Sequence, residues 1–207
     1  MATSFEEQLD AMNELVKQGK VRHIGLSNET PYGLLKFLET AKSNGSPSVV
    51  SVQNAYNLLE RNDFETSMLE ACHYTHTSLI AHSPLAGGAL TGKYILDSEK
   101  ESTASEEARL KKFVGYTGRY LLPSAQAAVT AYTELAAKYA LTPAQLALAW
   151  CYSRPFVTST LVGATSVEQL RENIMALNCP LTSEMEGEIY ELYCNEHREP
   201  TKGLNIL

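Results

Sequence analysis

The sequence predicts an α/β fold in which four parallel strands alternate with helices. Four short runs with β-strand character lie at residues 21–26, 49–52, 78–81 and 156–162, and segments with the apolar spacing of helices separate them. The runs are largely apolar rather than strictly alternating, which is typical of a parallel sheet covered on both faces. This order of elements indicates βα units.

The helices of the first half begin and end at recognisable residues. A capping-box pattern at residues 4–7 precedes a helix over 5–18, which a glycine ends. Residues 30–31 are a Thr-Pro pair, so a second helix begins there and runs to residue 44, before Gly45. A third helix is expected to begin at Asn62 or Asp63 and to run through Cys72, ahead of the strand at 78–81.

The second half interrupts this alternation before resuming it. Residues 84–92 are rich in glycine and proline, and the polar residues that follow show no apolar period, so a long excursion loop is expected over 95–123. The later helices are expected over 124–139, 142–150, 166–177 and 182–196, followed by a tail at 197–207. The whole chain is expected to be one partial domain.

Composition and charge exclude several classes of protein. The 207 residues carry 17 Lys plus Arg against 24 Asp plus Glu, a formal net charge of -7, so a duplex nucleic-acid partner is not expected. The apolar runs are too short to cross a membrane, and the N-terminus lacks the pattern of a signal peptide. Four widely spaced cysteines fit reduced thiols. We therefore expect a cytoplasmic protein without a membrane or metal site.

Small polar residues follow each predicted strand. They lie at residues 27–28, 53–54, 82–83 and 163–166. Ligands of α/β proteins bind at the carboxyl ends of strands, so these four groups favour one site, although any single group could simply begin a loop. Residues 163–166 also lead into a capped helix, whose N-terminal N–H groups favour an anion. The Gly-Pro-rich segment 83–88 could approach a phosphate closely, with Lys93 adding charge.

Four motifs resemble those of the aldo-keto reductases, in the same order. They are GKVRHIGLSN at residues 19–28, VQN at 52–54, AHSPLAGGALTGKY at 81–94 and VGATSVEQLREN at 162–173. The most similar branch includes the potassium-channel β subunits and related plant and bacterial reductases. The resemblance extends from Phe5 to Leu192. It implies the C-terminal half of a (β/α)8 TIM barrel, with four parallel strands and flanking helices, that binds NADP.

The resemblance also implies the residues that bind the cofactor. Those matching the nicotinamide carboxamide site are Ser27, Asn28 and Gln53. His82 replaces the aromatic ring that usually stacks on the nicotinamide. The residues matching the pyrophosphate loop are Ser83, Leu85, Ala86 and Lys93, and those matching the adenosine and 2′-phosphate end are Gly163, Thr165, Gln169, Glu172 and Asn173.

The family's catalytic tetrad of Asp, Tyr, Lys and His lies on the first four strands of the barrel. Met1 falls just before the helix that precedes the fifth strand, so the resemblance implies that no residue of this chain matches the tetrad. Tyr56 and His76 lie in other segments and are not substitutes. An inactive, NADPH-binding half of a carbonyl reductase is therefore expected.

Two other interpretations stay open. One is a non-catalytic half-barrel that binds a nucleotide or a protein. The other is a doubly wound domain with a different ligand, which leaves the four motifs unexplained. Both the NADPH-binding half and the non-catalytic half-barrel are open half-barrels that expose two strand edges. For either of them, self-association or a complementary N-terminal half is expected.

Overall fold

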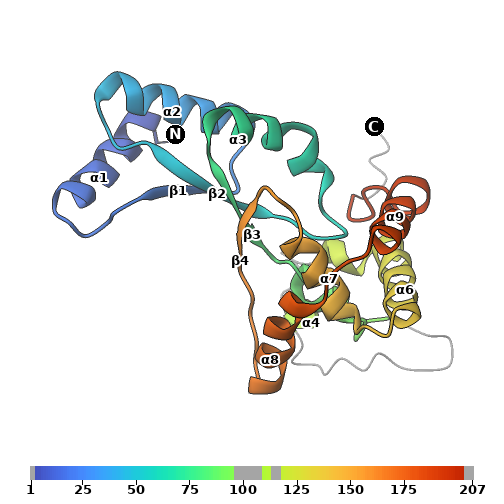
Figure 1. Cartoon of the computed structure of the whole chain (residues 1–207). Coiled ribbons are helices and arrows are strands. Elements are labelled where there is room, and N and C mark those ends of the chain that lie inside the picture. Colours follow the sequence, from blue (N-terminus) through green and yellow to red (C-terminus); the bar gives the residue numbers. More distant parts are fainter. Residues whose placement is uncertain (1–2, 96–108, 113–117, 203–207) are drawn as a thin grey trace. The chain divides into compact units, whose positions relative to one another are not determined.

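The computed structural model describes residues 3–95, 109–112 and 118–202, and the chain forms two compact units (Figure 1). The first unit comprises Met1–Asn54, Asp63–Ala81 and Phe156–Ser159. The second comprises Ala55–Asn62, His82–Pro155 and Thr160–Leu207.

The first unit contains the predicted parallel sheet. Its strands are β1 (Ile24–Ser27), β2 (Val49–Ala55), β3 (Ser78–His82) and β4 (Val157–Thr160). The last residue of each of β2, β3 and β4 belongs to the second unit. The strand order is β1-β2-β3-β4, and all four run parallel. The α/β class and the four parallel strands of a partial barrel are thus confirmed.

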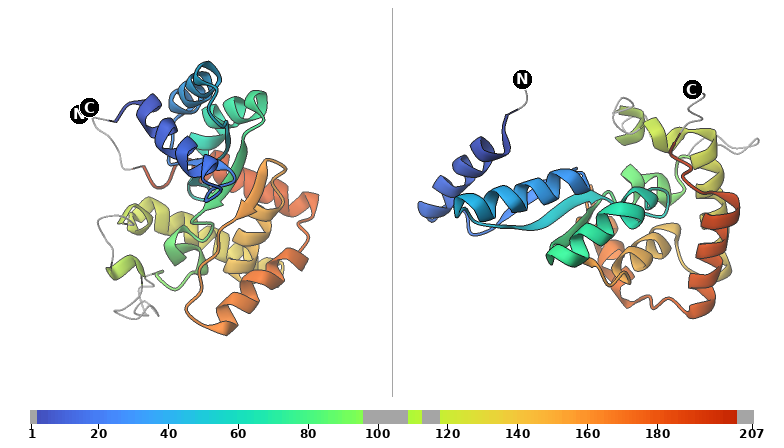
Figure 2. Two further views of the ribbon diagram at one scale, coloured as in Figure 1. Left: turned by 90° about the vertical axis from the view of Figure 1, so that its left-hand side faces the viewer. Right: turned by 90° about the horizontal axis from the view of Figure 1, so that it is seen from above.

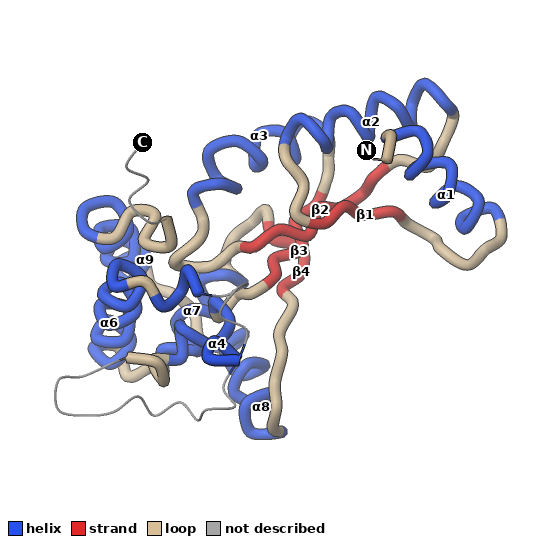
Figure 3. The backbone as a smooth tube through the Cα atoms, turned by 180° about the vertical axis from the view of Figure 1, so that it is seen from behind, coloured by secondary structure: helices blue, strands red, loops and turns tan. Residues whose placement is uncertain are grey.

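Helices α2 (Pro31–Asn44) and α3 (Leu69–Thr75) lie along one face of this sheet (Figures 1 and 3). Thr30 caps α2 by accepting a hydrogen bond from the Gly33 N–H at 3.1 Å, and Gly45 ends the helix with a left-handed φ of 65°. Both ends are those predicted.

Helix α1 (Phe5–Lys17) packs on α2, and Figure 2 shows the two helices from further directions. The rings of Phe5 and Phe37 meet edge to face with 4.8 Å between centroids, while the Leu9 side chain is buried. The expected third helix begins differently, since the π-helical turn η1 (Phe64–Met68) precedes α3.

The second unit is helical and centres on α7 (Pro143–Tyr152). Residues 146–151 of α7 are all buried, and α6 (Pro123–Lys138), α8 (Val167–Met175) and the 3-10 turn η2 (Ala86–Thr91) all pack against it. The Trp150 ring stacks on Tyr56 with centroids 5.1 Å apart. The unit also contains η4 (Ala176–Asn178), α9 (Ser183–Glu191) and the π-helical η5 (Leu192–Glu196).

Only parts of the expected excursion loop over 95–123 are described. Within it lie the short helix α4 (Arg109–Lys112) and the 3-10 turn η3 (Gly118–Leu121), and α6 begins at Pro123. Residues 96–108 and 113–117 lie outside the described part. The described part of the predicted tail contacts its own unit, because the Ser124 hydroxyl donates to the Pro200 carbonyl at 2.7 Å.

Candidate functional site

Three predicted nicotinamide residues meet at the carboxyl ends of β1 and β2, within the first unit. Ser27 pairs with Gln53 in the parallel register, and the Asn28 N–H donates to the Gln53 carbonyl at 2.9 Å. Asn28 has a left-handed φ of 52°, a conformation that Asn tolerates better than most residues. Ser27 and Asn28 are exposed and Gln53 is half-buried, so hydroxyl and amide groups line this strand end.

Asn54 fixes the loop beyond this strand end. Its Nδ2 donates to the Glu29 carbonyl at 3.1 Å, while its Oδ1 is buried and has no hydrogen-bond partner among the described residues. The Glu29 carboxylate in turn accepts from the Thr30 N–H at 2.8 Å. The loop that carries Asn28 is therefore tied both to β2 and to the start of α2.

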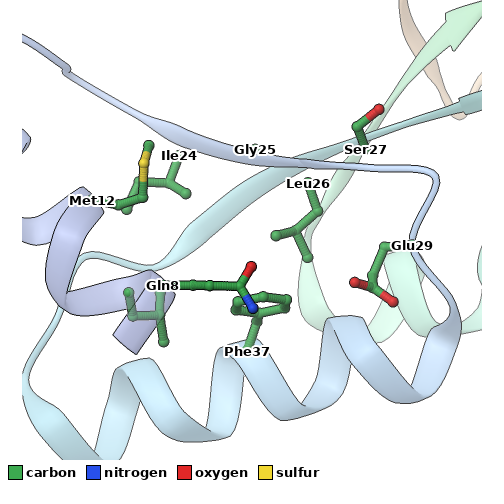
Figure 4. Close-up of a pocket in the computed structure, with 9 residues that line it drawn as sticks. Gln8, Met12, Ile24, Gly25, Leu26, Ser27, Glu29 and Phe37 are labelled. Carbon is green, nitrogen blue, oxygen red and sulfur yellow. The ribbon is translucent and has the colours of Figure 1, made fainter. Parts of the chain in front are cut away.

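A cavity of about 260 Å³ lies between β1 and the helices α1 and α2 (Figure 4). Polar and apolar groups contribute about equally to its lining, with Met12 and Ile24 at one end and Leu26 beside Phe37. Figure 4 shows the Ser27 hydroxyl on the other side of β1 from Leu26, as strand alternation requires. The cavity is therefore a space between sheet and helices, and the Ser27 hydroxyl faces away from it.

His82 and Ser83 lie at the start of the η2 segment in the second unit. The Nδ1 atom of His82 lies 3.1 Å from the Ser83 hydroxyl oxygen. Partial burial lowers the pKa of His82, opposed by the charge of Glu60 and assisted by that of Arg119. His82 is therefore a neutral, flat imidazole at neutral pH.

The predicted pyrophosphate residues form a tight turn. Ser83, Ala86, Gly87 and Gly88 all have a positive φ, between 50° and 100°. The Ala86 N–H donates to the Ser83 carbonyl at 2.8 Å, and the N–H groups of Gly88 and Leu90 donate to the Leu85 carbonyl. These three N–H groups are already used within the turn.

Lys93 approaches the same turn through its side chain. A Cβ atom added at Gly88 would lie 3.3 Å from the Lys93 Cε and 3.4 Å from its Nζ, so the glycine makes room for the lysine. The ammonium also lies 5.2 Å from the centre of the Tyr94 ring. The predicted cation is thus held beside the glycine turn.

The third predicted group lies at the start of α8. Ser166 caps the helix by accepting from the Gln169 N–H at 3.2 Å. The Gln169 carboxamide oxygen accepts from the Thr165 N–H at 2.9 Å, one residue earlier than a capping box would require. Gly163 has nothing within 4 Å of an added Cβ atom, and the whole segment 161–170 is exposed. This helix N-terminus is open to solvent.

Glu172 and Asn173 lie one turn further along α8. The Glu172 carboxylate accepts from the Thr142 hydroxyl at 2.6 Å. Asn173 is only 3% exposed, and its Nδ2 has no hydrogen-bond partner among the described residues. A buried donor without a partner carries a cost of about 1–3 kcal/mol, which a ligand acceptor would remove.

Sequence reasoning missed an ionic cluster beside His82. The Arg119 guanidinium lies 3.1 Å from the Glu60 carboxylate, and the Tyr120 hydroxyl donates to the same carboxylate at 2.6 Å. Burial, with the charge of Glu60, raises the pKa of Tyr120. The partners are about 60 positions apart, so no local pattern indicates this cluster.

The described residues contain neither a cluster of metal ligands nor a membrane-spanning helix. No group of three or more His, Cys, Asp or Glu side chains among them could hold a metal ion. Within residues 3–95, 109–112 and 118–202, every helix is too short or too polar to span a membrane. All four cysteines are free thiols, and burial raises the pKa of both Cys72 and Cys151 to about 11.

Comparison with known proteins identifies the family. The sequence profile of the Aldo/keto reductase family matches residues 1–193. The chain is 39% identical to Protein tas of Escherichia coli over 188 residues, which cover 91% of this chain and 52% of that protein. It is 44% identical to an aldo-keto reductase of Babesia bovis over 194 residues, covering 91% of this chain and 67% of that protein.

A third relative is the L-glyceraldehyde 3-phosphate reductase of Escherichia coli, 33% identical over 85% of this chain and 50% of that enzyme. The chain spans about half the length of most of the curated relatives that it matches. The matching profile and the parallel βα units agree in one conclusion: this chain belongs to the aldo/keto reductase family of oxidoreductases.

Proposed function

We propose that this chain is the NADP(H)-binding half of an aldo-keto reductase, and that the catalytic tetrad of the enzyme lies outside it. The observation that supports this most strongly is the Asn173 carboxamide, a buried donor without a partner among the described residues, one turn beyond the exposed N-terminus of α8. A purine offers ring-nitrogen acceptors that suit such a donor. In this proposal, Asn173 and Glu172 hold the adenine.

Each remaining group has chemistry that suits one part of the cofactor. Ser27, Asn28 and Gln53 present hydroxyl and amide groups that match a nicotinamide carboxamide, and His82 presents a flat neutral ring. Lys93 supplies a positive charge to the pyrophosphate, and the N-terminus of α8 favours the 2′-phosphate. When bound, NADPH would supply the hydride that reduces a carbonyl substrate.

We expect the chain to bind NADPH in preference to NADH, and Thr165→Asp to reduce that preference. Two unit charges 4 Å apart interact by about 1 kcal/mol in water, so an added carboxylate near a phosphate should weaken NADPH binding about fivefold. The affinity for NADH, which lacks the 2′-phosphate, should change little. Isothermal titration with each cofactor measures both affinities.

Thr182→Asp is the matched control for this substitution. Thr182 caps α9 as an exposed residue, so the variant adds the same charge at another helix start, where Asp is a good cap. The NADPH affinity of the control should match that of the unaltered chain. Equal affinities for NADPH and NADH in the unaltered chain would contradict the assignment of the 2′-phosphate to α8.

The proposal also gives the chain a protein partner, either a second copy or a complementary N-terminal half. Strands β1 and β4 stand at the two ends of the strand order. Helix α8 exposes Val167, Leu170 and Ile174, which share one helical face and are 66%, 43% and 54% exposed. An apolar face of this kind marks an interaction surface.

We therefore expect the isolated chain to self-associate, and Ile174→Glu to weaken that association. Size-exclusion chromatography with light scattering over a range of concentrations gives the mass. Tyr74→Glu is the control, because Tyr74 is also a large exposed side chain, on α3 of the other unit. A monomer at all concentrations, or an equal effect of the two substitutions, would argue against a role for this face.

A further inference from the structure

The residue after β3 adopts an uncommon backbone conformation. Ser83 has a φ of 53°, in the left-handed region that residues other than glycine rarely occupy. Such a conformation costs free energy and persists only where the surrounding structure holds it. Its surroundings therefore show what fixes this turn.

Asn57, which lies in the same unit, holds the Ser83 peptide. Its Nδ2 donates to the Ser83 carbonyl at 3.0 Å, and its Oδ1 accepts from the Leu59 N–H at 3.0 Å. The backbone of Asn57 pairs with Glu60 through hydrogen bonds of 3.1 and 3.2 Å. The side chain is completely buried, at 0% exposure, so its carboxamide is fixed at both ends.

The neighbouring peptide of β3 is held by the same segment. The Tyr56 N–H donates to the His82 carbonyl at 3.2 Å, next to the Asn57 contact. His82 and Ser83 are also joined through their side chains, with 3.1 Å between Nδ1 and the hydroxyl oxygen. The orientation of the imidazole is therefore coupled to the backbone conformation that Asn57 fixes.

We infer that Asn57 is a positioning residue for the nicotinamide end of the cofactor site, acting through the His82–Ser83 turn. This inference rests on the proposed function, which assigns His82 to the nicotinamide. Without the Asn57 carboxamide, the Ser83 peptide can relax to an ordinary φ, and the His82 ring and the Ser83 hydroxyl then lose their joint orientation. The adenosine end at α8 is formed by other residues and should be unaffected.

The test compares two ligands on Asn57→Ala. NADPH binding, followed by its fluorescence, reports the whole cofactor, whereas 2′,5′-ADP reports the adenosine end alone. We expect Asn57→Ala to weaken NADPH binding about tenfold and to change 2′,5′-ADP affinity less than about twofold. Asn62→Ala is the control, because Asn62 lies in the same segment and donates to Glu199 instead, at 2.6 Å.

Several outcomes would overturn the inference. Unchanged NADPH affinity would do so, as would an equal loss for both ligands, because a general loss of folding weakens both. If Asn57→Ala does not fold, as judged by circular dichroism, the same comparison is made on Asn57→Ser, which keeps a short donor. If the unaltered chain binds 2′,5′-ADP and NADPH, the proposed function stands whichever way the variants behave; if it binds neither, both fail.

Discussion

The chain alone should reduce aldehydes at least about a hundredfold more slowly than a full-length relative, because the proposed function places the proton donor outside it. Transfer of a hydride to a carbonyl leaves an alkoxide that must be protonated. General acid catalysis supplies roughly two to four orders of magnitude in rate. A tyrosine at its ordinary pKa is a weak acid unless a nearby cation lowers that pKa. The proposal places such a Tyr-Lys pair outside this chain.

His82 would be a poor substitute for the acid that the proposal places outside this chain. Burial lowers its pKa, so the imidazole is neutral at neutral pH and becomes an acid only as the pH falls through that lowered value. Any activity that depends on His82 as an acid would therefore rise as the pH falls. A role in stacking on the nicotinamide would show no such rise.

NADPH oxidation in the presence of 4-nitrobenzaldehyde measures this rate, with the denatured chain as blank and a full-length relative for comparison. Robust saturable turnover by the chain alone would contradict the proposal. In that event, His82→Phe separates the two roles, because phenylalanine keeps a flat ring and removes the proton. Loss of turnover in His82→Phe would identify His82 as the acid.

Replacing Trp150 by Ala should destabilise the chain by about 3–5 kcal/mol, the usual cost of removing a large aromatic side chain from a core. Trp150 is 1% exposed, stacks on Tyr56 and lies 4.9 Å below the Arg61 guanidinium carbon. The substitution therefore removes buried area, a ring pair and a cation–π contact together.

Unfolding in urea, followed by circular dichroism, gives the change in free energy. Tyr190→Ala is the control. Tyr190 is 60% exposed on α9, so its replacement should lower the free energy of unfolding by under about 1 kcal/mol. A similar, small effect of both substitutions would show that α7 is not the centre of the second unit's core.

Features encoded by neighbouring residues could be predicted from the sequence. The caps at Ser4, Thr30 and Ser166 form the expected hydrogen bonds, each within three positions of the chain. Such bonds depend on residue type and spacing alone. The predicted helices other than α3 therefore begin within about one residue of their expected starts, and each of the four strands overlaps its predicted range.

Strand limits and helix interiors depend on tertiary contacts and were less predictable. The first strand begins at Ile24 rather than Val21, and its pairing with β2 is irregular between Ile24 and Gly25. The final predicted helix becomes π-helical from Leu192. Neither feature can be recognised from a pattern of neighbouring residues in the sequence.

In the candidate site, too, features set by neighbouring residues could be predicted and features set by tertiary contacts could not. Motif residues such as Gln53 and Thr165 could be named from sequence, because they lie next to strand or helix ends. The supporting residue Asn57 could not, because its partner Ser83 lies 26 positions away and the bond exists only in the folded unit. The roles assigned to the motif residues stay predictions.

Calorimetric titration of NADPH into the purified chain decides whether the chain binds NADP(H). We expect a single saturable binding site per chain, with an affinity below that of a full-length relative, and competition by 2′,5′-ADP at the α8 end. Absence of saturable binding in a folded chain, shown by circular dichroism on the same sample, would contradict it.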